Sequence, residues 1–206
     1  MDFFILADII GIVAFALSGF LAGVRHRLDL LGLIIVASLT ALGGGVIRDL
    51  MLDRTPFAFN HYYPAVTVIT SVMIALALRL YRRDALERKW LFIISDTVGL
   101  VAFSITGALL GIAAEFNFFG VIIVSFLTAI GGGVTRDVLV NTVPAILTSD
   151  FYGTIAVIVA VMLIVLDALG WLNDTAVLAV ALFATVLRLV AHYRGWHLPH
   201  LDLPPR

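Results

Sequence analysis

An apolar segment with three consecutive glycines and an Arg-Asp pair occurs twice in this chain. Residues 40–56 read TALGGGVIRDLMLDRTP and residues 128–144 read TAIGGGVTRDVLVNTVP, a separation of 88 residues (128 − 40 = 88). The same offset relates further positions outside the motif: Asp8 and Asp96, Gly11 and Gly99, Phe15 and Phe103, Gly19 and Gly107, Gly23 and Gly111. The chain is therefore an internal repeat, and its two halves must have related structures.

The composition restricts where such a repeat can fold. The chain is 62% hydrophobic and 13% charged, with a mean hydropathy of +1.10, whereas a soluble domain is about half apolar and about a quarter charged. We therefore expect an integral membrane protein. Basic patches interleaved with aromatic residues are absent from the sequence, which argues against a nucleic-acid partner. Without cysteine the chain has no disulfide and no thiolate chemistry.

A helix needs about 20 apolar residues to cross the bilayer core. This length predicts seven helical spans, near residues 3–24, 30–52, 64–81, 91–113, 118–140, 151–170 and 175–193. The spans hold nearly the whole chain, so we expect a single transmembrane domain over residues 1–206.

The repeat and the span count together predict an inverted topology. Repeat 1 covers residues 3–81 and repeat 2 covers residues 91–170, and each holds three spans. Because three is odd, the second repeat enters the membrane from the opposite side, as in many transporters. The expected fold is all-α, an inverted 3+3 repeat plus a seventh helix at residues 175–193.

Lysine and arginine predict the orientation of the spans. With the N-terminus outside, the inner segments hold eight basic residues and the outer loops hold only Arg54. The eight are Arg25, Arg27, Arg82, Arg83, Arg88, Lys89, Arg194 and Arg206. We therefore expect the N-terminus outside and the C-terminus in the cytoplasm. The basic residues determine topology and also suit contact with anionic lipid.

The consecutive glycines allow two interpretations. They can let two helices pack closely, as small residues do in membranes. They can instead kink or unwind the helix, which the bilayer tolerates only where the backbone faces protein or water. Freed carbonyls in such a kink would coordinate a cation. We favour the kink for Gly43, Gly44 and Gly45 and for their equivalents Gly131, Gly132 and Gly133.

Ionisable residues within spans are functional candidates by default. At a rise of about 1.5 Å per residue, Asp8 lies about 7 Å into the first span and Arg48 about 6 Å from the end of the second. Because these depths match, we predict an Asp8–Arg48 pair near one mouth of the protein. The repeat predicts an Asp96–Arg136 pair near the other. Asp49 and Asp137 adjoin the arginines. These pairs allow two interpretations, a role in gating or a purely structural role in helix packing.

One face of the first span carries Asp8, Phe15 and Ser18 at helical spacing, and the fourth span repeats it with Asp96, Phe103 and Thr106. Thr40 and Thr128 lie one turn before the glycines. This face suits a wet pore wall with phenylalanine constrictions, or a small-residue seam between helices. The sequence shows no nucleophile–base pair, phosphate loop or metal-ligand spacing, so we expect no enzyme, no metal site and no cofactor.

Two copies of GGG-V-x-R-D in a chain of 3+3+1 spans resemble the TRIC cation-channel family, whose prokaryotic branch has been called UPF0126 and includes proteins described as glycine transporters. The resemblance implies a homotrimer in a prokaryotic cell membrane. It also implies a pore in each protomer for potassium and other monovalent cations such as sodium, lined near the two glycine kinks. The only lysine is Lys89, so the lysine-centred phosphoinositide binding of animal members does not carry over.

Two functions follow from these patterns. The first is a passive, potassium-permeable cation channel. The second is a carrier for a small zwitterion such as glycine, whose carboxylate would meet Arg48 or Arg136 and whose amine would meet an aspartate. Inverted repeats serve both, and the family resemblance favours the channel.

Overall fold

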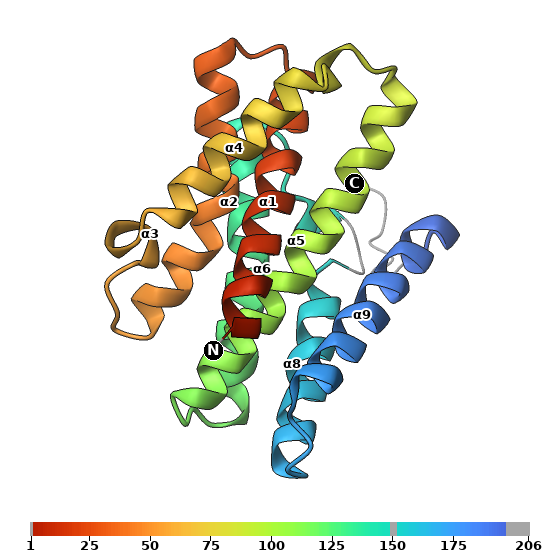
Figure 1. Cartoon of the computed structure of the whole chain (residues 1–206). Coiled ribbons are helices and arrows are strands. Elements are labelled where there is room, and N and C mark those ends of the chain that lie inside the picture. Colours follow the sequence, from red (N-terminus) through yellow and green to blue (C-terminus); the bar gives the residue numbers. More distant parts are fainter. Residues whose placement is uncertain (1, 149–151, 197–206) are drawn as a thin grey trace, which may run out of the picture.

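The structure is a computed structural model that describes residues 2–148 and 152–196, and it is helical over most of these ranges. Figure 1 shows the arrangement. The first half contains α1 (Asp2–Arg25), α2 (Leu30–Met51), α3 (Phe57–Asn60), α4 (Tyr63–Ala77) and a 3₁₀ turn, η1 (Leu80–Arg82). The second half contains α5 (Ala85–Ala113), α6 (Phe118–Leu139), α7 (Ala145–Thr148), α8 (Gly153–Ala168) and α9 (Asp174–Arg194).

Short polar side chains fix where the long helices begin. Asp29 accepts a hydrogen bond from the backbone N–H of Gly32 at 2.7 Å, and Asn117 accepts one from Gly120 at 2.9 Å. Each bond satisfies a backbone donor that the first helical turn leaves unpaired. Asp29 and Asn117 are themselves 88 residues apart (117 − 29 = 88). The repeat thus includes the signals that start its second helices.

The predicted ends of the third and fourth spans differ from the structure. Helix α4 ends at Ala77, not at residue 81, because Arg79 has a left-handed backbone with φ of 53°. Helix α5 starts at Ala85, not at residue 91, because Asp84 caps it by accepting from Glu87 N at 2.7 Å. Hydropathy locates the apolar run, whereas capping residues decide the helix end.

Within the described residues, five helices are long and apolar enough to cross a membrane: α1, α2, α5, α6 and α9. Helices α4 and α8 are apolar but have only 15 and 16 residues. By length alone, the structure therefore supports an all-helical membrane protein without fixing the number of spans at seven. Residue 151, the predicted start of the sixth span, and Arg206 lie outside the described residues.

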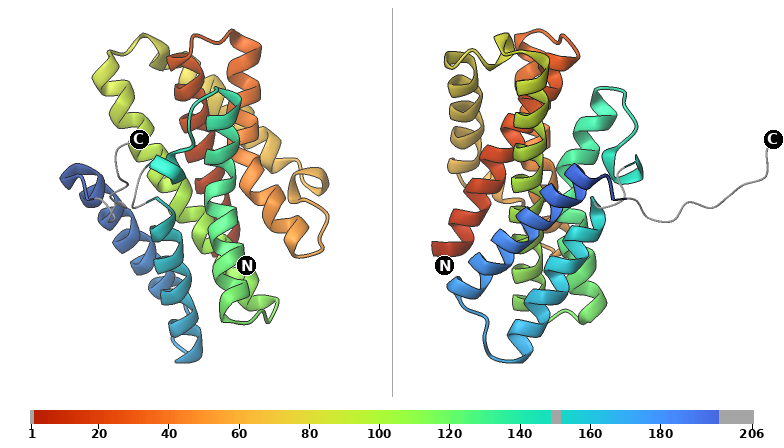
Figure 2. Two further views of the ribbon diagram at one scale, coloured as in Figure 1. Left: turned by 180° about the vertical axis from the view of Figure 1, so that it is seen from behind. Right: turned by 90° about the vertical axis from the view of Figure 1, so that its right-hand side faces the viewer.

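Helices α1, α2, α5 and α6 pack against one another at the centre, and α4, α8 and α9 lie around them. Figures 1 and 2 show that α1 and α5, which are equivalent in the repeat, run in opposite directions. The same holds for α2 and α6. A sequence repeat with opposite helix directions is what an inverted topology requires.

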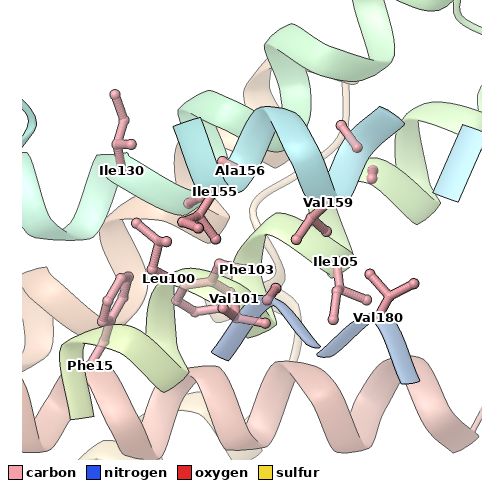
Figure 3. Close-up of a cluster of buried hydrophobic side chains, with 14 of the residues drawn as sticks. Phe15, Leu100, Val101, Phe103, Ile105, Ile130, Ile155, Ala156, Val159 and Val180 are labelled. Atoms are coloured by element: carbon pink, nitrogen blue, oxygen red, sulfur yellow. The ribbon is translucent and has the colours of Figure 1, made fainter. Parts of the chain in front are cut away.

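The apolar core lies between these layers (Figure 3). Phe15 of α1 and Phe103 of α5 meet edge to face, with ring centroids 5.3 Å apart, and both side chains are fully buried. Ile155 and Val159 of α8 and Val180 of α9 belong to the same core. Phe15 also packs against Gly99 and Phe103 against Gly11. Through these side chains, α1 and α5 pack directly against each other.

The glycine triplets do not unwind their helices. Helices α2 and α6 are continuous through residues 43–45 and 131–133, so unwinding at the glycines is wrong, whereas a kink there stays a prediction. A methyl group on Gly44 would overlap the carbonyl oxygen of Thr128, and one on Gly132 would overlap that of Thr40. The glycines therefore let the backbones of α2 and α6 touch, which is the close-packing alternative.

The other glycines of the triplets differ in how much space surrounds them. A methyl group on Gly45 would meet the Phe57 ring, and one on Gly133 would meet the Tyr152 hydroxyl. At Gly43 the nearest atom is Thr135 Oγ1, at 3.4 Å, an ordinary contact distance. Adjacent glycines on α2 thus provide one position that needs glycine and one that does not.

We expect Gly44→Ala to destabilise the protein by about 1–3 kcal/mol, the usual cost of overpacking, because its Cβ would meet backbone that has no freedom to move aside. Gly132→Ala should behave alike, since its contact is equivalent. Gly43→Ala is the matched control, and its free energy of unfolding should lie within about 0.5 kcal/mol of that of the unchanged protein. Thermal unfolding in detergent measures this, and equal midpoints for Gly43→Ala and Gly44→Ala would contradict it.

Candidate functional site

The first buried charge cluster joins α1, α2 and α4 around Asp8. Arg48 Nη1 donates to Asp8 Oδ1 at 3.1 Å, and the Tyr63 hydroxyl donates to Asp8 Oδ2 at 2.9 Å. Arg48 Nε donates to Asp49 Oδ1 at 3.0 Å. Asp8, Arg48 and Asp49 are at most 2% exposed. Their mutual bonding is what makes these charges tolerable away from water.

Asp49 has a second role that connects the cluster to the following turn. Its Oδ2 accepts from the backbone N–H of Phe57 at 2.8 Å, the first residue of α3. Asp137 does the same for Ala145 at 2.8 Å, the first residue of α7. The sequence analysis missed these short helices. The prolines that precede them, Pro56 and Pro144, were the available signal, because proline is favoured just before or at a helix start.

The second cluster surrounds Asp96 and takes side chains from more elements. Arg136 Nη1 donates to Asp96 Oδ1 at 2.6 Å, and Arg136 Nε donates to Asp137 Oδ1 at 2.8 Å. Arg188 Nη2 of α9 donates to Asp96 Oδ2 at 3.1 Å. The Tyr152 hydroxyl donates to Asp96 Oδ1 at 3.3 Å. We name the two groups the Asp8 cluster (Asp8, Arg48, Asp49, Tyr63) and the Asp96 cluster (Asp96, Arg136, Asp137, Tyr152, Ser18, Arg188).

Aromatic rings flank the arginines of both clusters. The guanidinium carbon of Arg48 lies 5.5 Å from the centre of the Phe4 ring and 5.2 Å from that of Phe57. Arg136 lies 4.7 Å from the Phe92 ring. Such contacts stabilise a cation that has left water. Phe4 and Phe92 are 88 residues apart (92 − 4 = 88), so the repeat offered a signal for them that the sequence analysis did not use.

The predicted contacts Asp8–Arg48 and Asp96–Arg136 are confirmed, while their role in gating stays a prediction. The sequence analysis missed Tyr63, Tyr152 and Arg188. The repeat could not place Tyr152, because the offset from Tyr63 leads to Phe151 (63 + 88 = 151). Arg188 lies outside the repeat and has no equivalent.

The polar positions predicted as a pore wall have separate environments. Ser18 joins the Asp96 cluster, where it accepts from Arg136 Nη1 at 2.5 Å. Thr106 instead bonds to the Phe103 carbonyl of its own helix at 3.3 Å. Thr40 and Thr128 each donate to the carbonyl four residues earlier, at 2.6 Å. All four side chains are fully buried, so a role in lining a pore stays a prediction.

Both clusters are held together by ion pairs between arginine and aspartate side chains. Over residues 2–148 and 152–196, no group of three or more His, Cys, Asp or Glu side chains is placed to hold a metal ion. The carboxylates of both clusters are already bonded to donors, which favours a structural or charge-controlling role over proton transfer.

Comparison with known proteins places this arrangement in context. A family model described as "Glycine transporter" matches the chain twice, at residues 5–79 and 93–168. The two matches start 88 residues apart (93 − 5 = 88). A UPF0126 membrane protein of Vibrio cholerae is 34% identical over 94% of this chain and 80% of its own length. The UPF0126 membrane protein YvgT of Bacillus subtilis is 34% identical over 95% of both chains.

Solved structures of similar fold are channels by their descriptions. One, described as "Structural basis for conductance through TRIC cation channels", is 35% identical over 98% of both chains, with a TM-score of 0.84. A prokaryotic TRIC channel crystallised in 0.5 M KCl is 28% identical over 95% of this chain and 98% of that chain, with a TM-score of 0.87.

The fold and its buried charge clusters define an all-helical integral membrane protein. The two copies of the glycine motif lie within the residues that the family model matches, and the solved TRIC channel covers 98% of this chain. The chain belongs to the TRIC/UPF0126 family of prokaryotic membrane proteins.

Replacing Arg48 tests whether the Asp8 cluster is as buried as the geometry indicates. Arg48→Gln leaves Asp8 and Asp49 without their cation, and we expect a loss of about 3–5 kcal/mol of stability. Arg54→Gln removes the same charge from an exposed position nearby and should change stability by less than about 0.5 kcal/mol. Thermal unfolding in detergent compares the two. A cost below about 1 kcal/mol for Arg48→Gln would mean that water reaches the cluster.

Proposed function

We propose that this protein is a passive, potassium-permeable channel for monovalent cations, with a conduction path within each protomer among α1, α2, α5 and α6. The observation that carries the proposal is the likeness over 98% of the chain, at 35% identity, to a structure described as a TRIC cation channel. The charge clusters are consistent with this path, since they connect α1 to α2 and α5 to α6.

A path that runs between α2 and α6 would be closed in this conformation. Methyl groups at Gly44 and Gly132 would overlap opposing backbone, so no ion fits between the helices there. Opening would require the two backbones to separate. The carbonyls of Thr40 and Thr128 would then face the gap, and carbonyl oxygens favour cations over anions.

The arginines are the candidates for control of this opening. Arg48 and Arg136 lie beside Asp8 and Asp96 and, as cations, oppose the entry of a permeating cation. Their bonds tie α2 to α1 and α6 to α5. A rearrangement that separates α2 from α6 would have to carry these pairs along or break them.

We also propose that the protein is a homotrimer in a bacterial cell membrane, with seven spans in an inverted 3+3+1 order. The opposite directions of α1 and α5 support the inversion. A solved relative with a TM-score of 0.87 and 28% identity is described as a trimeric intracellular cation channel orthologue, which supports the trimer. Helices α4 and α8 would complete the seven spans, with their ends extended by the adjoining loops.

The proposed orientation places the N-terminus outside, and the absence of cysteine makes it testable with single cysteines. Thr55→Cys lies in a predicted outer loop and Leu86→Cys in a predicted inner segment, and both positions are exposed. A membrane-impermeant maleimide added to intact cells should label Thr55→Cys, whereas Leu86→Cys should react only after lysis. The reverse pattern would contradict the orientation, and labelling of both in intact cells would contradict the span count between them.

Lipid is the partner we propose for the basic end of the bundle. Arg82, Arg83 and Lys89 are exposed around η1 and the start of α5, and Arg88 is half-buried there. An apolar groove of about 360 Å³ lies beside them between α1 and α5, lined by residues such as Ile10, Leu80 and Leu91. A groove of this kind suits an acyl chain, and the arginines suit an anionic head group.

A carrier of small zwitterions is the second candidate, and the family model's description as a glycine transporter favours it. A carrier needs a central site that holds the substrate's carboxylate and amine. In this structure Arg48 and Arg136 are already bonded to two aspartates each, so glycine would have to displace a carboxylate. The channel is therefore our first proposal.

Purified protein in planar bilayers with potassium chloride separates the two functions. We expect discrete current steps whose reversal potential in a salt gradient follows potassium, since a channel passes ions down their gradient. Vesicles loaded with radiolabelled glycine provide the parallel test. Saturable glycine exchange without current steps would overturn the channel and support the carrier.

A further inference from the structure

The short helix α3 brings the chain back against the end of α2 that carries Arg48 (Figure 1). The turn that leads into α3 contains Asp53, whose backbone is left-handed with φ of 53°. The first residue of α3, Phe57, is 8% exposed, whereas Phe59 on the same helix is 78% exposed. One ring of this connector therefore belongs to the protein interior, and the other does not.

Phe57 contacts α2 through its backbone and through its ring. Its backbone N–H donates to Asp49 Oδ2 at 2.8 Å. The centre of its ring lies 5.2 Å from the guanidinium carbon of Arg48. The ring also fills the space over Gly45, where an added methyl group would overlap it. The ring thus occupies a notch in α2 that exists because residue 45 has no side chain.

The same ring contacts two groups that bond Asp8. Its centre lies 6.3 Å from that of the Tyr63 ring, and the Tyr63 hydroxyl donates to Asp8 Oδ2 at 2.9 Å. Arg48 Nη1 donates to Asp8 Oδ1 at 3.1 Å. An aromatic ring that covers a guanidinium attracts it and so restricts its position. Phe57 therefore supports the arrangement in which both groups reach Asp8.

The notch lies in the turn of α2 that also touches α6. Gly44 meets the Thr128 carbonyl of α6, and the next residue, Gly45, meets Phe57. This turn is therefore held by α6 on one face and by α3 on another. The proposed opening requires α2 to move away from α6. Such a movement shifts the backbone of Gly45 relative to the Phe57 ring, which has no clearance there.

The second half has the equivalent backbone contact without the ring. Ala145 occupies the position of Phe57 (57 + 88 = 145), and its N–H donates to Asp137 Oδ2 at 2.8 Å. The Tyr152 hydroxyl fills the space over Gly133, the equivalent of the notch glycine. Since the hydrogen bond to aspartate places α7 without a ring, the ring of Phe57 is additional to what such a connector needs.

We propose that Phe57 is a positioning residue that acts as a latch: with its ring over Gly45, it holds Arg48 beside Asp8 and keeps α2 in the closed arrangement. The inference rests on the proposed channel function. The ring makes these contacts in the present conformation, and opening moves α2 away from it. Loss of the ring therefore removes stabilisation from the closed state, and the population of the open state rises.

Open probability in planar bilayers with potassium chloride tests the latch. Phe57→Ala removes the ring, whereas Gly45→Ala keeps the ring and pushes it out of the notch. Each should raise the open probability about threefold or more, a change that the loss of one cation–π contact can produce. The double variant Gly45→Ala/Phe57→Ala should match Phe57→Ala, because residue 45 acts through the ring and the two effects are then not additive.

Two control variants separate the latch from general damage. Phe59→Ala removes the exposed ring of the same helix, and Gly43→Ala adds a methyl group where the nearest atom is at an ordinary contact distance. Both should keep the original open probability. A purely structural role for Phe57 would lower the unfolding temperature of Phe57→Ala without raising its open probability. That result, or additive effects in the double variant, would overturn the proposal.

The remaining outcomes also decide the matter. If neither the unchanged protein nor any variant gives current, the channel proposal fails and this inference falls with it. If the unchanged protein conducts but is already open nearly all the time, only the latch fails. Should Phe57→Ala not assemble, Phe57→Leu decides, because leucine keeps an apolar side chain and removes the ring. A raised open probability in Phe57→Leu supports the latch, and an unchanged one overturns it.

Discussion

A buried guanidinium needs partners for its donors, and this requirement organises both halves of the protein. Arg48 binds Asp8 on α1 and Asp49 on its own helix, and Asp49 in turn accepts from the backbone of α3. One arginine thus connects α1, α2 and the turn that leads to α4. Arg136 does the same for α5, α6 and α7. Removing a partner would leave a charge without compensation in a low-dielectric interior.

The two halves are joined by contacts that need small residues. Gly44 and Gly132 bring the backbones of α2 and α6 together, and Gly11 and Gly99 accept the rings of Phe103 and Phe15. The glycines are thus at helix crossings, where any larger residue would hold the helices apart. If the proposed conduction path runs between α2 and α6, opening it must loosen the same contact that packs the two helices together.

The second half is not a copy of the first, because α9 has no partner in the repeat. Through Arg188 it adds a cation to the Asp96 cluster, while Ser18 reaches the same cluster from α1. Helix α9 and Ser18 therefore give the Asp96 cluster partners that have no equivalent in the Asp8 cluster.

The sequence by itself determined the membrane class, the helical repeat and the pairing of Asp8 with Arg48 and of Asp96 with Arg136, because hydropathy, spacing and depth in a bilayer are local or periodic properties. It did not determine what the glycines do: their cost in a single helix suggested a kinked or unwound backbone, whereas α2 and α6 stay helical and touch. Nor did it place Tyr63, Tyr152 or Arg188, which approach the aspartates only after α4, α8 and α9 have packed. Tertiary structure decided these points, since contact between distant helices depends on how they cross, and no spacing along one chain records that.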